Sequence, residues 1–548
     1  MNRRREAALV VTLALVTTAA LTYPLAFRLG HGGRVDSWDG LFSIWNIAWV
    51  ARTVVAEPSS LFHANIFHPH TYTLAFSEAN LVAGVLAAPA YWLTGNIYAA
   101  HNSAVLISFV LAFVGAYLLV RHLTGNLAAA LVAAVLFAFC PFIFARSAHI
   151  QLLMTAGLPF SMLGFHRLVE QPGIRRGAEL GLLLTITALA CGYYGLFAGL
   201  MVGVGILFYA TTERMWRSVE FWSGIGTAVV VGALVTGVFF LPYMAIGEIH
   251  GSIARTLDEA RVYSADTGAW LASPARAHGW LLARLDGWSE VLFPGFLLTA
   301  LAAGGLATAL RSTFASEARG AQTRAIRHAA WLYTIIGVLA AWASFGPNAG
   351  FYTLLFETIP GFGMLRAPAR LGIVVSLCLA VAAGVAVTRL TAGRHGHWIA
   401  TALVLVGLAE LAPVAYPHYE APRFPGAYRI LSKLEPGPVA EFPYYNNRWD
   451  FPRHSYYLVG STSHWLPLVN GYSDLIPQDF RAEVDELAQF PTNAGLSLLA
   501  ARDTRYVVFH RELYDDATWR EIELRIAGFR QLLPIFWDDD AWLYAITE

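Results

Sequence analysis

Long apolar runs with almost no charge recur along this sequence, and they restrict its fold more than any other feature. About twenty apolar residues in a helix span the hydrocarbon core of a bilayer. The runs lie at about 7–27, 97–120, 126–145, 149–165, 219–245, 291–310, 328–345, 371–388 and 397–416. Hydrophobic residues make up 56% of the chain and charged residues only 14%. The sequence therefore predicts a polytopic, all-helical membrane bundle.

Basic clusters between these runs predict the orientation of the spans. The clusters include the arginines at positions 3–5 and the segment 311–328, and the positive-inside rule places them in the cytoplasm together with the N-terminus. Successive connections must alternate between the cytoplasmic and the outer side of the membrane. The 35-residue run 177–211 must therefore be two short spans that turn near CGYYG. The same alternation requires residues 79–95 to lie in the interface or to re-enter. We therefore expect about eleven spans, with the first one an uncleaved anchor.

Two domains follow from this topology. Residues 1–416 would form the transmembrane domain, with a long first outer loop at 28–96, and residues 417–548 would form a small extracytoplasmic α/β domain. In that tail, GPVAEFP and RYVVFHR have the pattern of strands, DATWREIELRIAG that of an amphipathic helix, and the last segment that of a hairpin around an acidic turn.

Two acids open the first outer loop. Asp36 and Asp39 precede the apolar stretch LFSIWNIAWV, which we expect to lie along the membrane surface as a helix. A carboxylate held at that level could deprotonate an acceptor hydroxyl as a general base, or help to hold a divalent metal ion against a phosphate. The alternative is structural, because aspartate also caps helix N-termini.

The same loop carries a group of histidines and one further acid. His68 and His70 flank a proline and could present two imidazoles to one ion, with His63 and Glu78 nearby in the sequence. The alternative is that these are hydrogen-bonding surface residues. No cofactor is certain from the sequence, and the metal, if there is one, is unknown. A loosely held Mg²⁺ or Mn²⁺ that involves Asp36 and Asp39 is one alternative.

Arginines on the predicted outer face oppose the usual charge bias. Arg146 lies in a short outer turn with His149 and Gln151, and Arg366 and Arg370 lie just before another span. Guanidinium groups at that level can clamp a phosphate through paired N–H donors. The alternative for each is snorkelling, or an ion pair with an acid of the same face.

Other polar or reactive residues inside the apolar runs are interpreted as structural. Glu410 lies near the outer end of the last span, where we expect it to reach the interface or to pair with an arginine. Tyr193 and Tyr194 fit an aromatic belt. Cys140 and Cys378, like the third cysteine, fall in apolar runs, so no disulfide is expected.

Three segments together resemble the GT-C superfamily of integral-membrane glycosyltransferases. They are DSWDGLFSIWNIAWV in the first loop, RSAHIQLLMTAGLPF entering the fourth span, and PGFGMLRAPAR. The tail contributes two further segments, SHWLPLVNGYSDLIP and DTRYVVFHREL. The two tail segments are also similar to bacterial membrane proteins of the YfhO type, which are grouped with that superfamily. The similarity covers most of the chain.

The resemblance implies transfer of a hexosyl or pentosyl group from a polyprenyl-phosphate donor to a glycan, lipid or protein acceptor. The reaction would occur at the outer face of a bacterial cytoplasmic membrane, during cell-envelope assembly. By position, Asp39 or Asp36 would be the base or metal ligand. Arg146, Arg366 and Arg370, together with His149, would hold the donor phosphate. A lipid-linked donor needs no nucleotide site, and we find no phosphate-cradling glycine loop.

Two other classes of function remain open from the sequence. A transporter or flippase for lipids or glycans also has many spans with few polar residues. A non-catalytic scaffold for envelope assembly would use the outer domain to bind a partner. The formal net charge is zero, so a nucleic-acid partner is not expected, whereas membrane lipid is.

Overall fold

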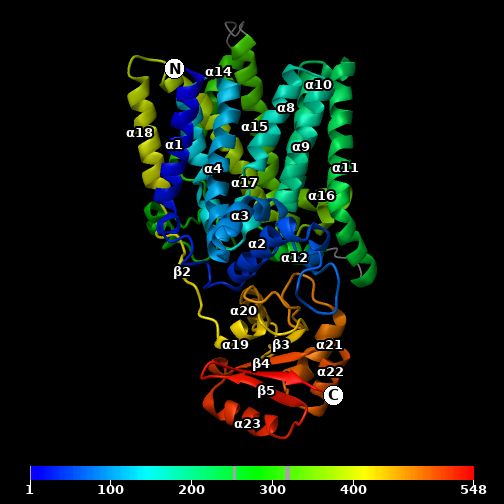
Figure 1. Ribbon diagram of the computed structural model, residues 1–548. Coiled ribbons are helices and arrows are strands. Elements are labelled where there is room, and N and C mark those ends of the chain that lie inside the picture. The colour runs from blue at the N-terminus through cyan, green and yellow to red at the C-terminus, as the bar shows by residue number, and fades with distance from the viewer. Residues whose placement is uncertain (1, 251–254, 315–320, 548) are drawn as a thin grey trace. The chain divides into compact units, whose positions relative to one another are not determined.

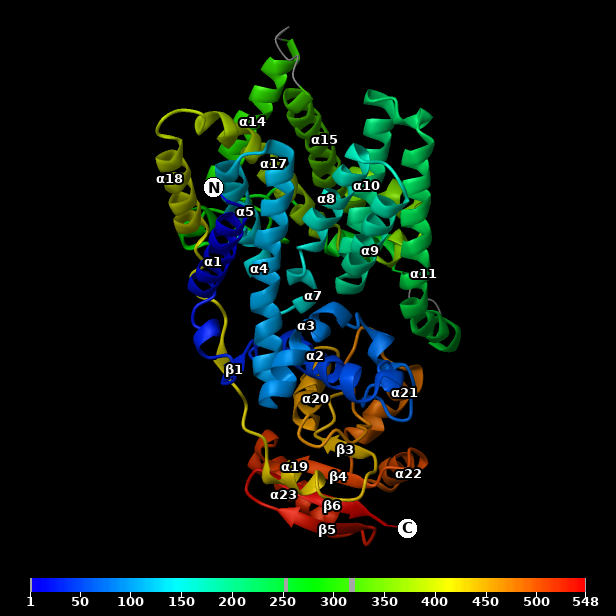
Figure 2. The ribbon, with the colours of Figure 1, turned by 45° about the horizontal axis from the view of Figure 1, so that its top comes forward.

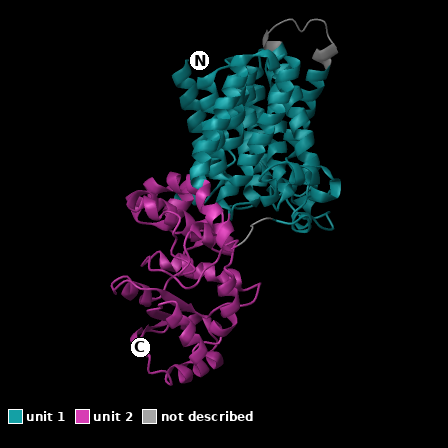
Figure 3. Ribbon diagram, turned by 90° about the vertical axis from the view of Figure 1, so that its right-hand side faces the viewer, with its two compact units in different colours: residues 1–27, 105–239, 253–416 teal, residues 28–104, 240–252, 417–548 magenta. Residues whose placement is uncertain are grey.

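A computed structural model describes residues 2–250, 255–314 and 321–547 of the chain. The chain forms two compact units, which Figure 3 shows in different colours. Unit 1 consists of residues 1–27, 105–239 and 253–416, and unit 2 of residues 28–104, 240–252 and 417–548. The predicted first outer loop therefore groups with the tail, and not with the helices that precede and follow it.

Unit 1 is built from helices (Figures 1 and 2). Its helices, of which α4 and α11 also contribute residues to unit 2, are α1 (Arg3–Leu21), α4 (Ile97–Thr124), α5 (Leu127–Ala138), α6 (Pro141–Ala145), α7 (Ile150–Leu153), α8 (Gly157–Glu170), α9 (Ile174–Ala190), α10 (Gly192–Thr212), α11 (Val219–His250), α12 (Leu257–Val262), α13 (Gly279–Leu282), α14 (Phe296–Phe314), α15 (Ala321–Ser344), α16 (Phe351–Thr358), α17 (Gly372–Leu390) and α18 (Gly396–Leu411).

Helix α17 lies at the centre of unit 1, where it packs against α5, α14 and α15. Small residues allow these backbones to approach closely. A Cβ atom on Gly305 of α14 would lie 1.9 Å from the carbonyl oxygen of Ala382 on α17. Close contact through small residues is the usual way in which helices pack in a bilayer, where apolar burial gives little driving force.

Six described helices are long and apolar enough to cross a membrane, and three shorter ones are apolar. The expected number of about eleven spans is therefore not confirmed. Residues 177–211 do fall into two helices, α9 and α10, which are separated at Cys191 as the sequence predicted. Residues 79–95 form a short helix, α3 (Leu81–Thr94), which belongs to unit 2.

Unit 2 combines the loop helices with a four-stranded sheet. Its regular elements, besides the parts of α4 and α11, are β1 (Gly32–Gly33), α2 (Trp38–Ala56), α3, β2 (Tyr419–Glu420), α19 (Gly426–Leu431), β3 (Val439–Phe442), α20 (Ser455–Ser461), α21 (Gln478–Leu487), α22 (Asn493–Ala501), β4 (Tyr506–His510), α23 (Asp516–Ile526), β5 (Leu532–Trp537) and β6 (Ala541–Ile546).

The sheet has the strand order β3-β4-β6-β5, in which β3 and β4 are parallel and the other neighbours antiparallel. Stacked rings of Phe442, Phe490 and Phe509 form part of its core, with centroids 4.8 to 5.8 Å apart. The two strands, the helix and the hairpin predicted for the tail are all confirmed.

Helix α2 is the apolar helix predicted after the first-loop acids. It packs against α3 and against α20 of the tail, and its buried face includes Trp45, which is fully buried. Gly84 of α3 is required for this packing, because a Cβ atom there would lie 2.3 Å from a methyl carbon of Val50. The loop helices thus form one core with the tail.

Candidate functional site

The two first-loop acids lie in different environments within unit 2. Asp36 precedes α2 and pairs with Arg34, whose Nε atom is 3.0 Å from the Asp36 Oδ1 atom. Asp39 lies in the first turn of α2 and is half-buried. Neither acid caps the helix, because the residue at the N-cap is Ser37.

Asp39 receives a hydrogen bond from the tail. The hydroxyl of Tyr472 donates to the Asp39 Oδ1 atom at 3.0 Å. The rings of Tyr472 and Phe42 pack edge to face, with their centroids 5.6 Å apart. Gly40 lets the preceding chain fold back onto the helix, because a Cβ atom there would lie 1.9 Å from the Arg34 carbonyl oxygen. The sequence reasoning missed Tyr472, which lies 433 residues from Asp39.

His68 and His70 attach the loop to the tail. The His70 Nε2 atom lies 3.0 Å from an oxygen of Asp479, and Arg502 donates to the same oxygen at 2.9 Å. Burial by itself would raise the pKa of Asp479, but the interactions with His70 and with the guanidinium of Arg502 outweigh it and lower that pKa. Burial lowers the pKa of His68, whose carbonyl oxygen accepts from Arg502 at 3.1 Å. This geometry supports the structural alternative for both histidines.

Glu78 and His63 complete the loop residues predicted for the site. The backbone carbonyl oxygen of Glu78 accepts hydrogen bonds from Asn80 at 3.1 Å and Asn46 at 3.4 Å. The Nδ1 atom of His63 accepts from the backbone N–H of Tyr72 at 3.3 Å. These bonds order the loop around α2.

In unit 1, Arg146 is buried in an ion pair. Its Nη2 atom lies 2.6 Å from the Oε2 atom of Glu290, and its guanidinium lies 3.9 Å from the centroid of the Phe142 ring. Burial lowers the pKa of Arg146, the carboxylate of Glu290 opposes this, and the charge of Arg370 adds to the lowering. Arg146 and Arg370 are thus close enough to repel each other.

Tyr193 brings the other two arginines together. The backbone N–H of Arg366 donates to the Tyr193 hydroxyl at 2.9 Å, and the Arg370 guanidinium lies over the Tyr193 ring, 4.3 Å from its centroid. The side chain of Arg366 lies 3.7 Å from Glu259 and is 31% exposed. The arginine cluster, Arg146, Arg366 and Arg370, was predicted from charge alone, whereas the role of Tyr193 in the CGYYG turn was not.

An apolar pocket of about 100 Å³ begins beside this cluster. Side chains of α10, α15, α16 and α17 line it, and so does Leu371, the neighbour of Arg370 in the chain. Phe197 also lines the pocket and contacts Tyr193, with ring centroids 6.1 Å apart. Within unit 1, positive charge therefore adjoins an apolar pocket between helices.

The remaining predicted polar residues lie at or near helix ends. His149 occupies the N-cap position of α7 without a capping bond from its side chain, and Gln151 lies within that short helix. Their predicted roles stay predictions. Glu410 accepts from the backbone N–H groups of Phe296 and, at 3.0 Å, Leu297, which begin α14. Its partner is His278 at 3.0 Å, and not an arginine as one expectation had it.

Among the described residues, no group of three His, Cys, Asp or Glu side chains has the arrangement of a metal site. Asp36 and Asp39 could supply two carboxylates, and further ligands would have to come from substrate or water. The requirement for Mg²⁺ or Mn²⁺ thus stays a prediction, and we derive no step through a metal ion.

No model of a protein family matches this sequence, and no curated protein does. Solved structures do match. The arabinofuranosyltransferase AftD from Mycobacteria is 15% identical, with a TM-score of 0.60, and the match covers 100% of this chain and 42% of that one. This chain thus spans less than half the length of that enzyme.

Two further solved structures match with lower scores. The oligosaccharyltransferase AglB from Archaeoglobus fulgidus is 13% identical, with a TM-score of 0.48, and the match covers 99% of this chain and 74% of that one. ArnT from Cupriavidus metallidurans is 14% identical, with a TM-score of 0.40 and coverage of 99% and 98%. The fold argument rests on the first match and on the apolar helices. This chain, with six described helices long and apolar enough to cross a membrane, shares the fold of the arabinofuranosyltransferase AftD.

Proposed function

We propose that this protein is a glycosyltransferase that moves a sugar from a polyprenyl-phosphate donor to an acceptor at the outer face of a bacterial cytoplasmic membrane. The observation that carries the proposal is the arginine cluster beside the apolar pocket in unit 1. The fold shared with an arabinofuranosyltransferase supports the reaction class. Fold by itself does not determine function, so the chemistry of the residues has to agree with it.

The arginine cluster and the pocket together suit an isoprenoid phosphate. Such a molecule has a long apolar chain and one anionic head, which need an apolar surface and a positive charge directly beside it. Arg370 stacks on Tyr193, and Leu371 next to it faces the pocket. Glu290 holds Arg146 at 2.6 Å and Glu259 holds Arg366 at the longer distance of 3.7 Å, so we assign the phosphate to Arg366 and Arg370 and give Arg146 a supporting role.

Asp39 is the better candidate for the base. Asp36 precedes helix α2 and pairs with Arg34, whereas Asp39 lies within the helix and receives a hydrogen bond from Tyr472 of the tail. The first turn of α2 also holds Asp39 at a defined position.

The proposed reaction is a single displacement. An acceptor hydroxyl oxygen attacks the anomeric carbon while Asp39 takes the hydroxyl proton, and the bond between the anomeric carbon and the phosphate oxygen breaks. Polyprenyl phosphate leaves with the bonding electrons, and Arg366 and Arg370 stabilise its charge. Attack from the face opposite the phosphate would invert the anomeric configuration.

The test is release of sugar from a panel of radiolabelled polyprenyl-phosphate pentoses and hexoses by the full chain in nanodiscs. We expect turnover with at least one donor, a loss of 10²-fold or more in Asp39→Asn with donor binding retained, and a smaller loss in Asp36→Asn. Absence of turnover with every donor, together with movement of labelled lipid across vesicle membranes, would favour the transporter alternative.

A further inference from the structure

The segment that ends at Tyr472 connects the first-loop acid to the core of the tail. Three backbone hydrogen bonds join it to the loop. Leu468 donates to the carbonyl oxygen of Asn65 at 2.9 Å, His68 donates to that of Leu468 at 2.8 Å, and Phe67 donates to that of Asn470 at 3.0 Å. We call residues 467–472 the strap. It holds the loop as a neighbouring strand would.

The strap is also fixed to the sheet. Val439 at the start of β3 donates to the Pro467 carbonyl oxygen, and Val469 donates back to Val439, both at 2.8 Å. Gly471 allows the strap to pass the loop, since a Cβ atom there would lie 2.5 Å from the ring of Phe67. A larger residue at this position would displace the strap from the loop.

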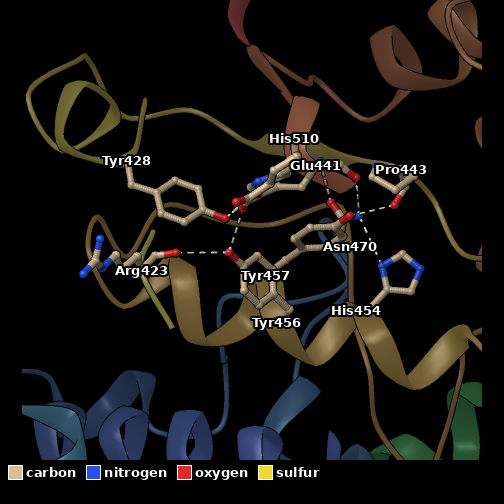
Figure 4. Close-up of polar contacts among 10 residues, drawn as sticks. Arg423, Tyr428, Glu441, Pro443, His454, Tyr456, Tyr457, Asn470 and His510 are labelled. Carbon is tan, nitrogen blue, oxygen red and sulfur yellow. Dashed lines mark hydrogen bonds and ion pairs between the residues drawn. The ribbon is translucent and has the colours of Figure 1, made fainter. Parts of the chain in front are cut away.

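A buried polar network secures Asn470, two residues before Tyr472 (Figure 4). The Asn470 side chain donates to the Glu441 carbonyl oxygen at 2.8 Å and accepts from the Glu441 N–H at 2.7 Å. It also donates to the Nδ1 atom of His454 at 3.3 Å. Asn470, Glu441 and His454 are all 0% exposed. A buried network with this many partners defines one position for the backbone that carries it.

We propose that Tyr472 is a positioning residue for Asp39, supplied by the tail and held by the strap. The inference rests on the proposed function, and it gives the tail a part in the reaction. The phenol hydroxyl holds the Oδ1 atom of Asp39 at 3.0 Å and so restricts rotation of the carboxylate. The contacts of the Tyr472 ring with Phe42 and Phe451 restrict its rotation.

A hydrogen bond of this kind has a kinetic signature. A neutral donor stabilises the ionised form of a carboxylate, so its removal moves the acid limb of the pH–rate profile to higher pH, by about one pH unit for a bond to a charged group. Loss of orientation lowers kcat without a change in donor affinity, because the bond that is lost is the one between the Tyr472 hydroxyl and the base. A purely structural role would give neither effect.

The experiment compares the wild type with Tyr472→Phe and with Tyr456→Phe, as full chains in nanodiscs. Tyr456→Phe is the matched control, because its hydroxyl also donates to a tail carboxylate, the Oε1 atom of Glu512 at 3.2 Å. We expect Tyr472→Phe to lower kcat about tenfold, to leave the donor KM within about twofold, and to shift the acid limb upward. Tyr456→Phe should keep the wild-type profile.

A second variant keeps the inference testable if Tyr472→Phe does not fold. Phe42→Leu keeps the Tyr472 hydroxyl but removes the ring that packs against it, so we expect a smaller fall in kcat in the same direction. The inference would be overturned if the wild type is active and Asp39→Asn is inactive, but Tyr472→Phe keeps the wild-type kcat and pH profile. The proposed function would survive that result. Absence of turnover by the wild type with every donor would overturn the proposed function, and this inference with it.

Discussion

Acid should weaken the tail of this protein through two buried histidines, His454 and His464. Burial lowers the pKa of each to about 4, although the Glu441 carboxylate opposes this at His464. The hydrogen bonds agree with neutral rings. Asn470 donates to the His454 Nδ1 atom, and the backbone N–H of Leu466 donates to the His464 Nδ1 atom at 3.0 Å. A proton added to the Nδ1 atom of either histidine would point at an N–H donor and break the existing hydrogen bond.

The magnitude follows from the difference between the folded and unfolded chains. A histidine in an unfolded chain titrates near 6.5, so the unfolded state binds more protons between about pH 6.5 and pH 4, and stability falls as the pH falls through this window. Each ring costs about 2 kcal/mol at pH 5 and about 3 kcal/mol at pH 4. The two together should lower the free energy of unfolding of the tail by about 4 kcal/mol between pH 8 and pH 5.

Hydrogen exchange of the β4 amides Tyr506–His510 in the full chain, corrected for the intrinsic effect of pH, measures this change. His464→Asn is the matched variant, because an asparagine oxygen can accept from Leu466 but does not titrate. It should remove about half of the pH dependence. Equal opening free energies at pH 8 and pH 5 in the wild type, or an unchanged dependence in His464→Asn, would refute the reasoning.

Three other perturbations test the contacts described above. Gly460→Ala should destabilise the tail by about 1–3 kcal/mol, because its Cβ atom would lie 2.4 Å from the Tyr428 ring; a thermal unfolding midpoint equal to that of the wild type would contradict the contact. Glu410→Ala should lower the unfolding midpoint of the helical unit by more than Glu410→Gln, which keeps an acceptor for the start of α14; equal shifts would show that the cap is unimportant. Arg370→Ala should weaken binding of polyprenyl phosphate about tenfold or more, measured by isothermal titration in nanodiscs, whereas Arg389→Ala at the far end of α17 should not; equal affinities would remove Arg370 from the donor site.

Local patterns predicted much of this fold. The apolar runs marked helices such as α10 and α17, because a span must be continuous and uncharged to cross a bilayer. Alternating and amphipathic patterns located β3, β4 and α23 in the tail, since each buries one side of a short segment. The choice of Arg366 and Arg370 also came from local information, as charges on a face where arginine is unusual.

The pairings across the chain could not be predicted in the same way. Tyr472 has no local feature that connects it with Asp39, and one sequence carries no record of which distant residues meet. The CGYYG turn suggested an aromatic belt, because an exposed tyrosine and one that stacks on an arginine look alike in sequence. The grouping of the first loop with the tail depends on hydrogen bonds such as that from Asn65 to Leu466, which no periodicity reveals.

The contacts between the first loop and the strap also determine an order of events during synthesis. The carbonyl oxygen of Asn65 accepts from the backbone N–H of Leu468 in the strap, which comes roughly 400 positions later in the chain. At about 5–20 residues per second, the ribosome needs on the order of a minute to reach that residue. During this interval the loop lacks the backbone partners that it has in the finished protein, and a chain that stops before the strap never acquires them. The tail thus completes a structure that the first outer loop begins much earlier in synthesis, and the loop gains these partners only after the strap has been made.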